Sequence, residues 1–407
     1  MSAGQRVLLV GDLGDSGFAA LRTRHFHVAI GNEAQVVDHR DDVVGAARAF
    51  RPTALVSAGN HGPTRALLRV LREVDGDLPA WIDVAGDPFA EAQAAAGAAP
   101  ANVAAEAQVV WAAAYARGDA FSTVADAGRD ALLGALGVLG RLPRWAPGEE
   151  PVWVVPCSAD FPDPPGAARG PGLRVALVGG FNTWFDDETA WEGLRRAMER
   201  APLTVDVFGG AIPGHAEAGY HRFRRAAEAS PHAARVRFHG WVPHDTLGPA
   251  LDAAHSTFTV DRPGPEARLG ARTRVLYALH RGLRVLATPG SPVVQEAIAA
   301  GLVTALAPAG AAEGAETLAD ALLDGRGAPP AAARAAWLAA RSVAATTAPL
   351  AHWAARPKRS PPAPHADVLV AVLAERDTLR QELAALRASP TFRALDRLNR
   401  RLRSLRS

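Results

Sequence analysis

The sequence has few of the residues that build disulfides, zinc sites and lysine-based anion sites. Cys157 is the only cysteine among 407 residues, so one copy of the chain can form neither an internal disulfide nor a multi-cysteine zinc site. Lys358 is the only lysine, and an anion site in the body must therefore use arginine, histidine or backbone amides. No apolar run approaches the roughly 18 residues of a membrane-spanning helix, and the first residues show no signal-peptide pattern. We expect a cytoplasmic protein in a reducing compartment.

Positive charge is concentrated at one end of the chain. Of 44 basic and 42 acidic residues, residues 356–407 hold 12 and 5, so the body before them is slightly acidic. The pI of about 9.1 therefore reflects the tail, and we expect no nucleic-acid partner. With 48% hydrophobic and 21% charged residues, the composition is that of a globular protein and excludes a mainly disordered chain.

Short apolar runs alternate with alanine-rich helical stretches in two series, a pattern typical of parallel sheets flanked by helices. A segment rich in proline and glycine, residues 160–172, lies between the series and is interpreted as an interdomain linker. We predict an α/β fold with two doubly wound, Rossmann-like domains, residues 1–159 and 173–330, that face a cleft. The expected strands are residues 6–10, 26–30, 53–56, 80–84, 120–124 and 152–155, then 173–178, 203–208, 236–238, 257–260, 284–287 and 303–306.

The end of the chain is predicted to be helical. Residues 331–355 are expected to pack back towards the first domain, and residues 356–365 form a proline-rich linker. Residues 366–388 carry a heptad seam that fits either self-association in a coiled coil or packing on the chain's own domain. The seam consists of Leu369, Val372, Arg376, Leu379, Leu383 and Leu386. Residues 391–407 form a basic amphipathic helix, suited to peripheral contact with an anionic membrane, to an acidic partner, or simply to a solvated end.

Two segments of the first domain place polar or small residues after a strand. Gly11, Asp12, Gly14 and Gly17 form a strand-to-helix turn that fits a cleft loop or a tight turn, with Glu33 as a ribose-binding candidate of a dinucleotide site. Asp83, Asp87 and Glu91 follow another strand and would bind sugar hydroxyls or supply a base, although Asp87 before Pro88 also fits a helix cap. His61 follows the preceding strand and is expected to reach the same cleft. A metal site is poorly supported because no histidine stands at ligand spacing.

The second domain carries the densest set of candidate residues. Its first strand leads into Gly179, Gly180, Asn182 and Trp184, where glycines allow close phosphate approach and a tryptophan suits a base or sugar face. Asp186 or Asp187 is expected to cap the next helix. A later strand end carries Asp261, Arg262, Glu266, Arg268, Arg272 and Arg274, followed by Thr288, Pro289, Gly290 and Ser291. Arginine binds phosphates bidentately, so this cluster predicts an anion site, although it also fits an ion-pair network.

Taken together, residues 5–350 resemble GT-B glycosyltransferases of the retaining, family-4-like type. VVPCSADF resembles the stretch before their interdomain linker, RVRFHGWVPHDTLGPALDAA the segment before their acidic motif, and EARLGARTRVLYALHRGLRVLATP their E-x7-E motif. Two departures stand out: Arg274 occupies the position of the second glutamate, and GGFNTWFDD lacks the usual basic residues. The tail with SPTFR is similar to tails on bacterial surface-polysaccharide glycosyltransferases.

The resemblance implies transfer of a sugar from a nucleotide-diphosphate sugar to a glycan or lipid-linked acceptor, with retention and without a required metal or other cofactor. It implies that Glu266 positions the sugar, that Arg272 and Arg274 neutralise the diphosphate, and that Gly180 and Asn182 add contacts. Asp83 and Asp87 would then face the acceptor. Two alternatives stay open: a catalytically silent GT-B scaffold that binds a sugar nucleotide or glycan, and an NAD-dependent oxidoreductase that uses the first glycine turn.

Overall fold

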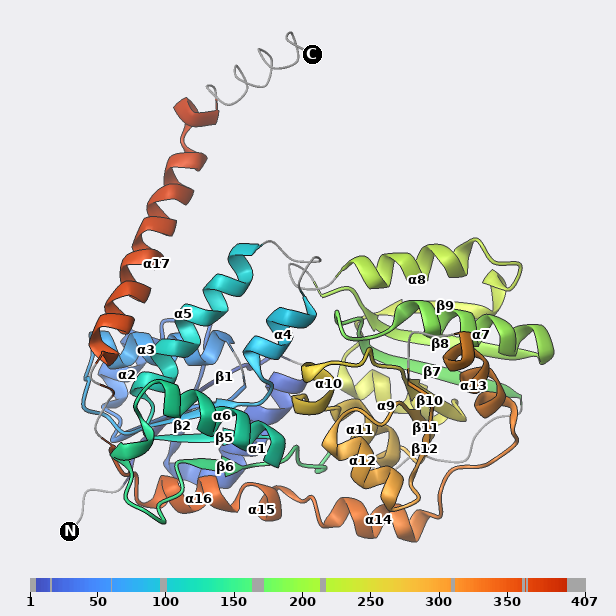
Figure 1. The fold of residues 1–407 in the computed structure, drawn as a ribbon, viewed down its shortest axis with the longest axis horizontal. Coiled ribbons are helices and arrows are strands. Elements are labelled where there is room, and N and C mark those ends of the chain that lie inside the picture. Colours follow the sequence, from blue (N-terminus) through green and yellow to red (C-terminus); the bar gives the residue numbers. More distant parts are fainter. Residues whose placement is uncertain are drawn as a thin grey trace.

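The protein folds into two α/β domains that lie side by side, with a long helix projecting from the first (Figure 1). The computed structural model describes residues 5–14, 17–59, 61–95, 101–162, 172–212, 217–308, 312–360, 363 and 365–393. Each domain contains a six-stranded parallel sheet with helices packed around it, which confirms the predicted fold class.

The first sheet has the strand order β2-β1-β3-β4-β5-β6. Strands β1, β3, β4 and β5 are buried throughout, as expected for parallel strands covered on both faces. Its strands are β1 (Val7–Gly11), β2 (Ala34–Asp38), β3 (Ala54–Ser57), β4 (Ala80–Val84), β5 (Ala120–Thr123) and β6 (Val152–Val154). Its helices are α1 (Phe18–Ile30), α2 (Val43–Phe50), α3 (His61–Glu73), α4 (Pro88–Ala94), α5 (Ala101–Arg117) and α6 (Asp126–Val138).

One predicted strand is wrong. Residues 26–30 belong to the last turns of α1, in which Phe26 and Ile30 are buried one turn apart, and the strand follows at Ala34–Asp38. A short apolar run fits a buried helix face as well as a strand, and here the helix continues through it.

The second sheet has the strand order β12-β11-β10-β7-β8-β9. The strands from β7 to β9 extend the sheet to one side, and those from β10 to β12 extend it to the other, so the strand order reverses between β7 and β10. Ligands of such sheets bind outside the carboxyl ends of the strands at this reversal. Its strands are β7 (Leu173–Gly180), β8 (Leu203–Gly210), β9 (Val236–Gly240), β10 (Ser256–Thr259), β11 (Arg284–Ala287) and β12 (Val303–Ala305). Its helices are α7 (Asp187–Arg200), α8 (Ala218–Glu228), α9 (His244–Asp252), α10 (Pro265–Leu269), α11 (Thr273–His280), α12 (Pro292–Ala299) and α13 (Ala312–Leu323).

The chain then returns to the first domain through three short helices that run beneath both domains (Figure 1). They are α14 (Ala331–Ala339), α15 (Val343–Thr346) and α16 (Ala348–Ala355). Two features separate these helices. The Ser342 side chain accepts a hydrogen bond from the Ala345 amide at 3.3 Å and so caps α15, and Pro349 lies in the first turn of α16. Trp353 of α16 is buried against Trp81 of β4, with ring centroids 5.6 Å apart, so this segment completes the core of the first domain.

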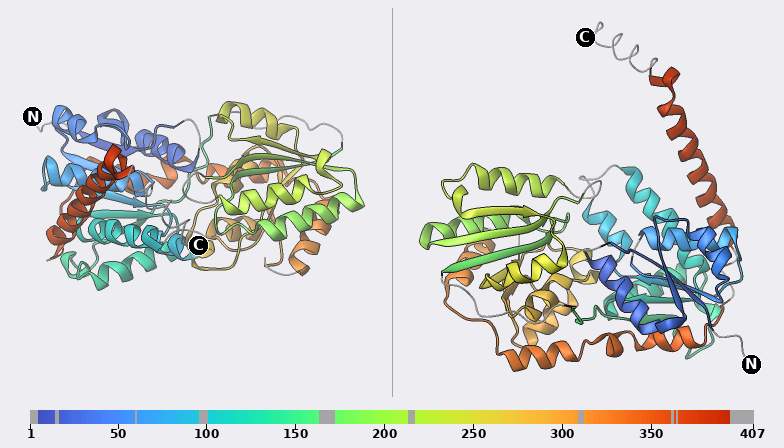
Figure 2. Two further views of the ribbon diagram at one scale, coloured as in Figure 1. Left: turned by 90° about the horizontal axis from the view of Figure 1, so that it is seen from above. Right: turned by 180° about the vertical axis from the view of Figure 1, so that it is seen from behind.

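The last described helix, α17 (Ala366–Ala388), begins against the first domain and leaves it (Figures 1 and 2). Leu373 is buried in the core beside α5, whereas the side chains near the other end are exposed. Most of the predicted basic amphipathic helix, residues 394–407, lies outside the described residues. Within the described part of the chain, no helix is both long and apolar enough to cross a membrane.

Candidate functional site

The carboxyl edges of the two sheets meet at the junction between the domains. Helix α10 of the second domain contacts α4 and α6 of the first. A cavity of about 200 Å³ opens beside this contact, lined by residues of both domains that include Ala125 and Cys157 on one side and Gly270 and Ala271 on the other. The segment that carries Glu266 therefore faces the helix that follows Asp87.

Glycines form the surface at the carboxyl ends of β7 and β8. Gly179 and Gly209 are paired and have φ angles of +100° and +105°, a region that favours glycine. A Cβ atom on Gly209 would collide with the Gly179 carbonyl, and one on Gly180 would meet the Ile212 side chain. This position next to the strand reversal thus presents backbone and allows a ligand to approach it closely.

Arg274 of α11 lies directly against these glycines. Its Nη2 donates to the Gly180 carbonyl at 3.1 Å, and a Cβ atom on Gly179 would stand 3.2 Å from its Cζ. Burial lowers the pKa of Arg274, and among the described residues it forms no ion pair. A half-buried guanidinium without an ion-pair partner in the described part of the chain, beside a backbone surface, is suited to the negative charge of a diphosphate.

Arg272, two residues earlier, is held by two carboxylates. Its Nε donates to Asp261 at 2.6 Å, and its two Nη atoms donate to both oxygens of Glu266 at 3.0 and 2.7 Å. All three side chains are at least 95% buried, and Trp184 lies 5.7 Å from the guanidinium. Burial opposes the charge of Arg272, but the two carboxylates outweigh it and raise its pKa. Arg272 therefore fixes Glu266 in place, and its own charge is already balanced.

Burial raises the pKa of Glu266, and the positive charge of Arg272 opposes this shift. Its bidentate contact with Arg272 leaves further lone pairs on each oxygen, which can accept hydrogen bonds from sugar hydroxyls.

Arg262 holds the loop after β7 through three polar contacts. Its Nη1 donates to the carbonyls of Thr183 and Phe185 at 3.1 and 2.8 Å, and its Nη2 pairs with Asp187 at 3.0 Å. Asp186 accepts from the Thr189 amide at 3.2 Å and caps α7, as predicted for one of the two aspartates. Arg262 thus supports the loop that carries Asn182 and Trp184, both half-buried.

Thr288, at the end of β11, supports the neighbouring strand end. Its Oγ1 accepts from the Asp261 amide at 2.9 Å. Ser291 in the same loop is fully buried, and its Oγ has no hydrogen-bond partner among the described residues.

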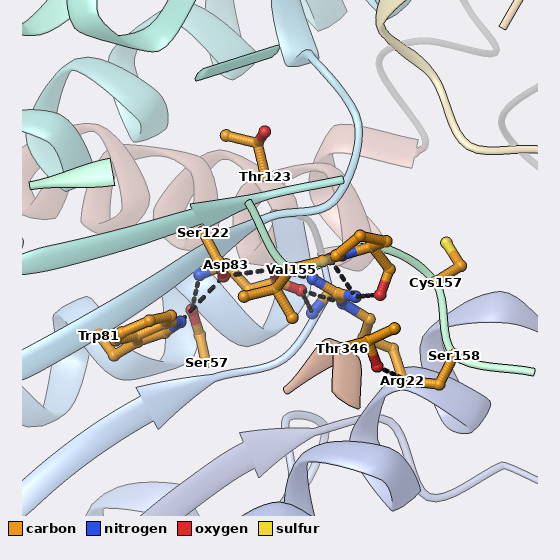
Figure 3. A network of polar contacts seen from close by, with 12 residues as sticks. Arg22, Ser57, Trp81, Asp83, Ser122, Thr123, Val155, Cys157, Ser158 and Thr346 are labelled. Carbon is orange, nitrogen blue, oxygen red and sulfur yellow. Dashed lines mark hydrogen bonds and ion pairs between the residues drawn. The ribbon is translucent and has the colours of Figure 1, made fainter. Parts of the chain in front are cut away.

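Asp83 does not face the acceptor side, which corrects the prediction from the sequence. The side chain is fully buried, and each oxygen accepts two hydrogen bonds (Figure 3). Oδ1 accepts from Arg22 at 2.7 Å and Ser122 at 2.7 Å, while Oδ2 accepts from Arg22 at 2.9 Å and the Gly59 amide at 2.9 Å. With its acceptor sites filled and no exposed surface, Asp83 has no position from which to act as a base on a substrate.

The same network joins the first domain to the interdomain crossing. Arg22 also donates to the carbonyls of Val155 and Pro156 at 2.8 and 3.1 Å. Two residues on, Ser158 shares a hydrogen bond of 2.6 Å with Thr346 of α15 (Figure 3). Asp83 and Arg22 therefore position the chain that links the domains.

Asp87, by contrast, precedes α4, the helix that contacts α10 at the junction between the domains. Its Oδ1 accepts from the amides of Phe89 and Ala90 at 3.1 and 2.7 Å, which confirms it as the cap of α4. The residue is half-buried, as is His61 at the start of α3. Glu91 lies on α4 itself, the helix that contacts α10.

The first glycine turn is shaped by contacts within its own domain. A side chain at Gly11 would collide with Thr23, and Asp12 accepts from the Gly14 amide at 2.7 Å and from Arg40 at 2.9 Å. Glu33 precedes β2 and so lies at the amino edge of the sheet, whereas a ribose would bind at the carboxyl edge. Glu33 as a ribose ligand is therefore wrong.

One candidate residue was missed. Trp241 follows β9, is 50% exposed, and donates from Nε1 to the Ala211 carbonyl at 2.9 Å. Its ring lies 3.6 Å from the position that a Cβ atom on Gly180 would take. An exposed ring fixed beside the glycine surface is a better stacking platform than Trp184. The available signal was a tryptophan three residues after the end of the strand predicted at residues 236–238.

Among the described residues, no group of three or more His, Cys, Asp or Glu side chains is arranged to hold a metal ion.

Comparison with known proteins identifies the fold. No protein-family model matches the chain, and the search of curated proteins found no matching sequence. Among solved structures, the chain is similar to Anabaena Alr3699/HepE in complex with UDP and glucose, with a TM-score of 0.59, 14% identity, and coverage of 86% of this chain and 98% of that one. It is also similar to sucrose-phosphate synthase from Thermosynechococcus elongatus, with a TM-score of 0.55, 14% identity, and coverage of 94% and 100%.

The lipopolysaccharide outer core galactosyltransferase WaaB matches with a TM-score of 0.50 and 11% identity over 86% of this chain and 99% of that one. Between 98% and 100% of each of these three solved chains is covered, so the likeness includes both domains. The chain has the GT-B fold.

Proposed function

We propose that this chain is a glycosyltransferase that moves a sugar from a nucleotide-diphosphate sugar to a glycan or lipid-linked acceptor. The observation that carries the proposal is the placement of Arg274, a half-buried guanidinium without an ion-pair partner among the described residues, against the glycine surface at the strand reversal of the second domain. The GT-B fold, shared with the structure of Anabaena Alr3699/HepE in complex with UDP and glucose, supports the same conclusion.

On the donor side, the glycine surface lets the diphosphate approach backbone, and Arg274 supplies the positive charge. Trp241 provides an exposed ring for the base, and Glu266 accepts hydrogen bonds from the sugar. Arg272 acts through Glu266 by fixing its orientation, and Asp261, Arg262 and Thr288 hold the two loops. Asn182 and Trp184 line the loop after Gly180.

On the acceptor side, Asp87 and α4 stand opposite Glu266 across the domain junction. Gly11, Asp12, Gly14 and His61 lie at the carboxyl edge of the same sheet and complete this side of the site. Asp87 uses Oδ1 to cap α4, and its other oxygen is the better candidate to contact an acceptor hydroxyl.

Retention follows if the departing diphosphate itself takes the proton of the acceptor hydroxyl on the same face of the sugar. This chain's residues then hold the two substrates together and stabilise the charge that develops on the leaving group. Because Arg274 can supply that charge, we expect transfer to proceed in EDTA, with no added divalent cation.

A role in cell-surface polysaccharide or glycoconjugate synthesis is proposed from the sequence of the tail. A lipid-linked acceptor lies at a membrane, and the basic segment within residues 391–407 would bring the enzyme to an anionic surface. Removal of residues 391–407 should then reduce co-sedimentation with phosphatidylglycerol vesicles and leave donor binding unchanged.

A catalytically silent GT-B scaffold is the second candidate, favoured by Arg274 at the position where family members carry a glutamate. A thermal-shift panel of nucleoside diphosphates, nucleotide-sugars and NAD separates the candidates, since a ligand of the native state raises the unfolding midpoint. A nucleotide shift with hydrolysis or transfer that is lost in Glu266→Gln supports the enzyme. A nucleotide shift without turnover supports the scaffold, and a shift with NAD alone contradicts both.

A further inference from the structure

The outer half of α17 exposes a row of large apolar side chains. Leu379, Leu383 and Leu386 are 57%, 44% and 55% exposed, and Val372 before them is 47% exposed. In the heptad frame of this helix, Leu369, Arg376 and Leu383 occupy position a, and Val372, Leu379 and Leu386 occupy position d. These six residues are called the seam below.

Four seam residues, Val372, Leu379, Leu383 and Leu386, are exposed, whereas Leu369 at the inner end of the seam packs against the core of the first domain. The domain is contacted by Leu373, which is buried, by Val370, and by Asp377, which pairs with Arg65 of α3 at 2.5 Å. These residues occupy heptad positions b and e, roughly 100° around the helix from the centre of the seam. Packing on the chain's own domain therefore accounts for the inner half of α17 and leaves the outer seam exposed.

The charges that flank the seam specify what covers it. Positions g carry Glu375 and Glu382, and positions e carry Arg380 and Arg387. In a parallel two-stranded coiled coil, each g residue meets the e residue five positions later on the partner. Two copies of α17 in register would pair Glu375 with Arg380 and Glu382 with Arg387, in both directions.

An antiparallel pair has the opposite result. It brings g against g and e against e, which would place glutamate against glutamate and arginine against arginine. The single polar seam residue, Arg376, adds a cost in stability but restricts the register. We propose that α17 binds a second copy of this chain in a parallel, in-register coiled coil, an inference that does not depend on the proposed transferase activity.

Attachment to the domain makes so short a coiled coil feasible. Three heptads in a free peptide form a marginal helix, because nucleation is costly. Here the first turns of α17 are fixed by Leu373 and by the Arg65–Asp377 pair, so less conformational freedom is lost on association. We expect a dimer with a dissociation constant in the micromolar range. In the parallel arrangement, the carboxyl ends of the two α17 helices lie at the same end of the coiled coil.

Charge reversal in the full-length chain tests the pairing. Sedimentation equilibrium of Glu375→Arg/Glu382→Arg and of Arg380→Glu/Arg387→Glu should each show a dissociation constant raised by roughly tenfold or more, and an equimolar mixture should regain the wild-type value. The matched control, Thr378→Arg/Ala385→Arg, adds charge at position c, away from the seam, and should remain dimeric. A wild-type chain that stays monomeric at about 100 µM, or reversals that act no more strongly than the control, would overturn the proposal.

A cysteine placed at the seam tests the orientation. In a Cys157→Ser background, Leu386→Cys lies opposite its own copy only in a parallel, in-register pair, within reach of a disulfide. Oxidation should give a covalent dimer, and Ala385→Cys should give much less. If Leu386→Cys stays dimeric by sedimentation but does not cross-link, the parallel arrangement is wrong.

Discussion

The Arg22–Asp83 pair offers a direct test of whether these residues build the fold or perform chemistry. In Arg22→Met, the Asp83 carboxylate stays buried and keeps only the Ser122 hydroxyl and Gly59 amide as donors. The carbonyls of Val155 and Pro156 lose the donor as well. Breaking a buried ion pair from one side typically costs about 3–5 kcal/mol, because it leaves an uncompensated buried charge.

We therefore expect Arg22→Met to lower the free energy of unfolding by about 3–5 kcal/mol, a factor of roughly 100 or more in the unfolding equilibrium. Urea unfolding followed by circular dichroism and tryptophan fluorescence measures this change, with the two domains fitted as separate transitions where they separate. The matched control is Arg224→Met, which removes an exposed guanidinium paired with Glu228 at 2.7 Å and should cost under about 1 kcal/mol.

If Arg22→Met costs no more than Arg224→Met, the structural role argued for this pair is wrong. Asp83→Asn should likewise be unstable, because its amide would replace an oxygen that accepts two hydrogen bonds. A stable Asp83→Asn chain that binds the donor normally but has lost transfer would contradict this structural role and support a role of Asp83 towards the acceptor.

Three further outcomes are expected. Trp241→Ala should weaken nucleoside-diphosphate binding by roughly tenfold or more in titration calorimetry, because it removes the exposed ring beside Gly180, and equal affinity would exclude base stacking there. Burial raises the pKa of Cys157, so in the folded chain at pH 8 its reaction with a disulfide reagent should be at least roughly tenfold slower than in urea; equal rates would show an accessible thiolate. Burial lowers the pKa of His25, so the unfolded state binds the proton more tightly than the folded state does. The free energy of unfolding should therefore fall as pH drops below about 6.5, and a His25→Gln chain should lose part of this pH dependence. The same pH profile in His25→Gln and the wild type would contradict this role of His25.

The strands of both sheets were largely predictable because parallel strands buried on both faces read as continuous apolar runs. The run at residues 26–30 failed because helix and strand bury such a segment equally well. Gly179 and Gly180 at the end of β7 were informative for a related reason, since a backbone surface at a strand end admits few other residues, whereas Gly209 at the end of β8 was not singled out from the sequence.

What the sequence could not show was which polar side chains already have partners. Asp83 lies near the end of β4 and Asp87 follows four residues later, yet Asp83 is enclosed by Arg22 and Ser122 and Asp87 lies at the domain junction. Arg272 and Arg274 differ in the same way: two carboxylates surround the first, and the second contacts the Gly180 carbonyl. Such partners come from strands and helices distant in sequence, and only the packed structure brings them together.

The donor site is tested most directly by titration calorimetry of the full chain with UDP, GDP and ADP, in the wild type and in Arg274→Ala. One nucleoside diphosphate should bind the wild type and should bind Arg274→Ala about ten- to a hundredfold more weakly, the loss expected for a charged hydrogen bond. Arg326→Ala, which removes an exposed arginine after α13, should bind as the wild type does. Equal affinity in Arg274→Ala and the wild type, or no binding of any of the three nucleotides, would contradict the proposed site.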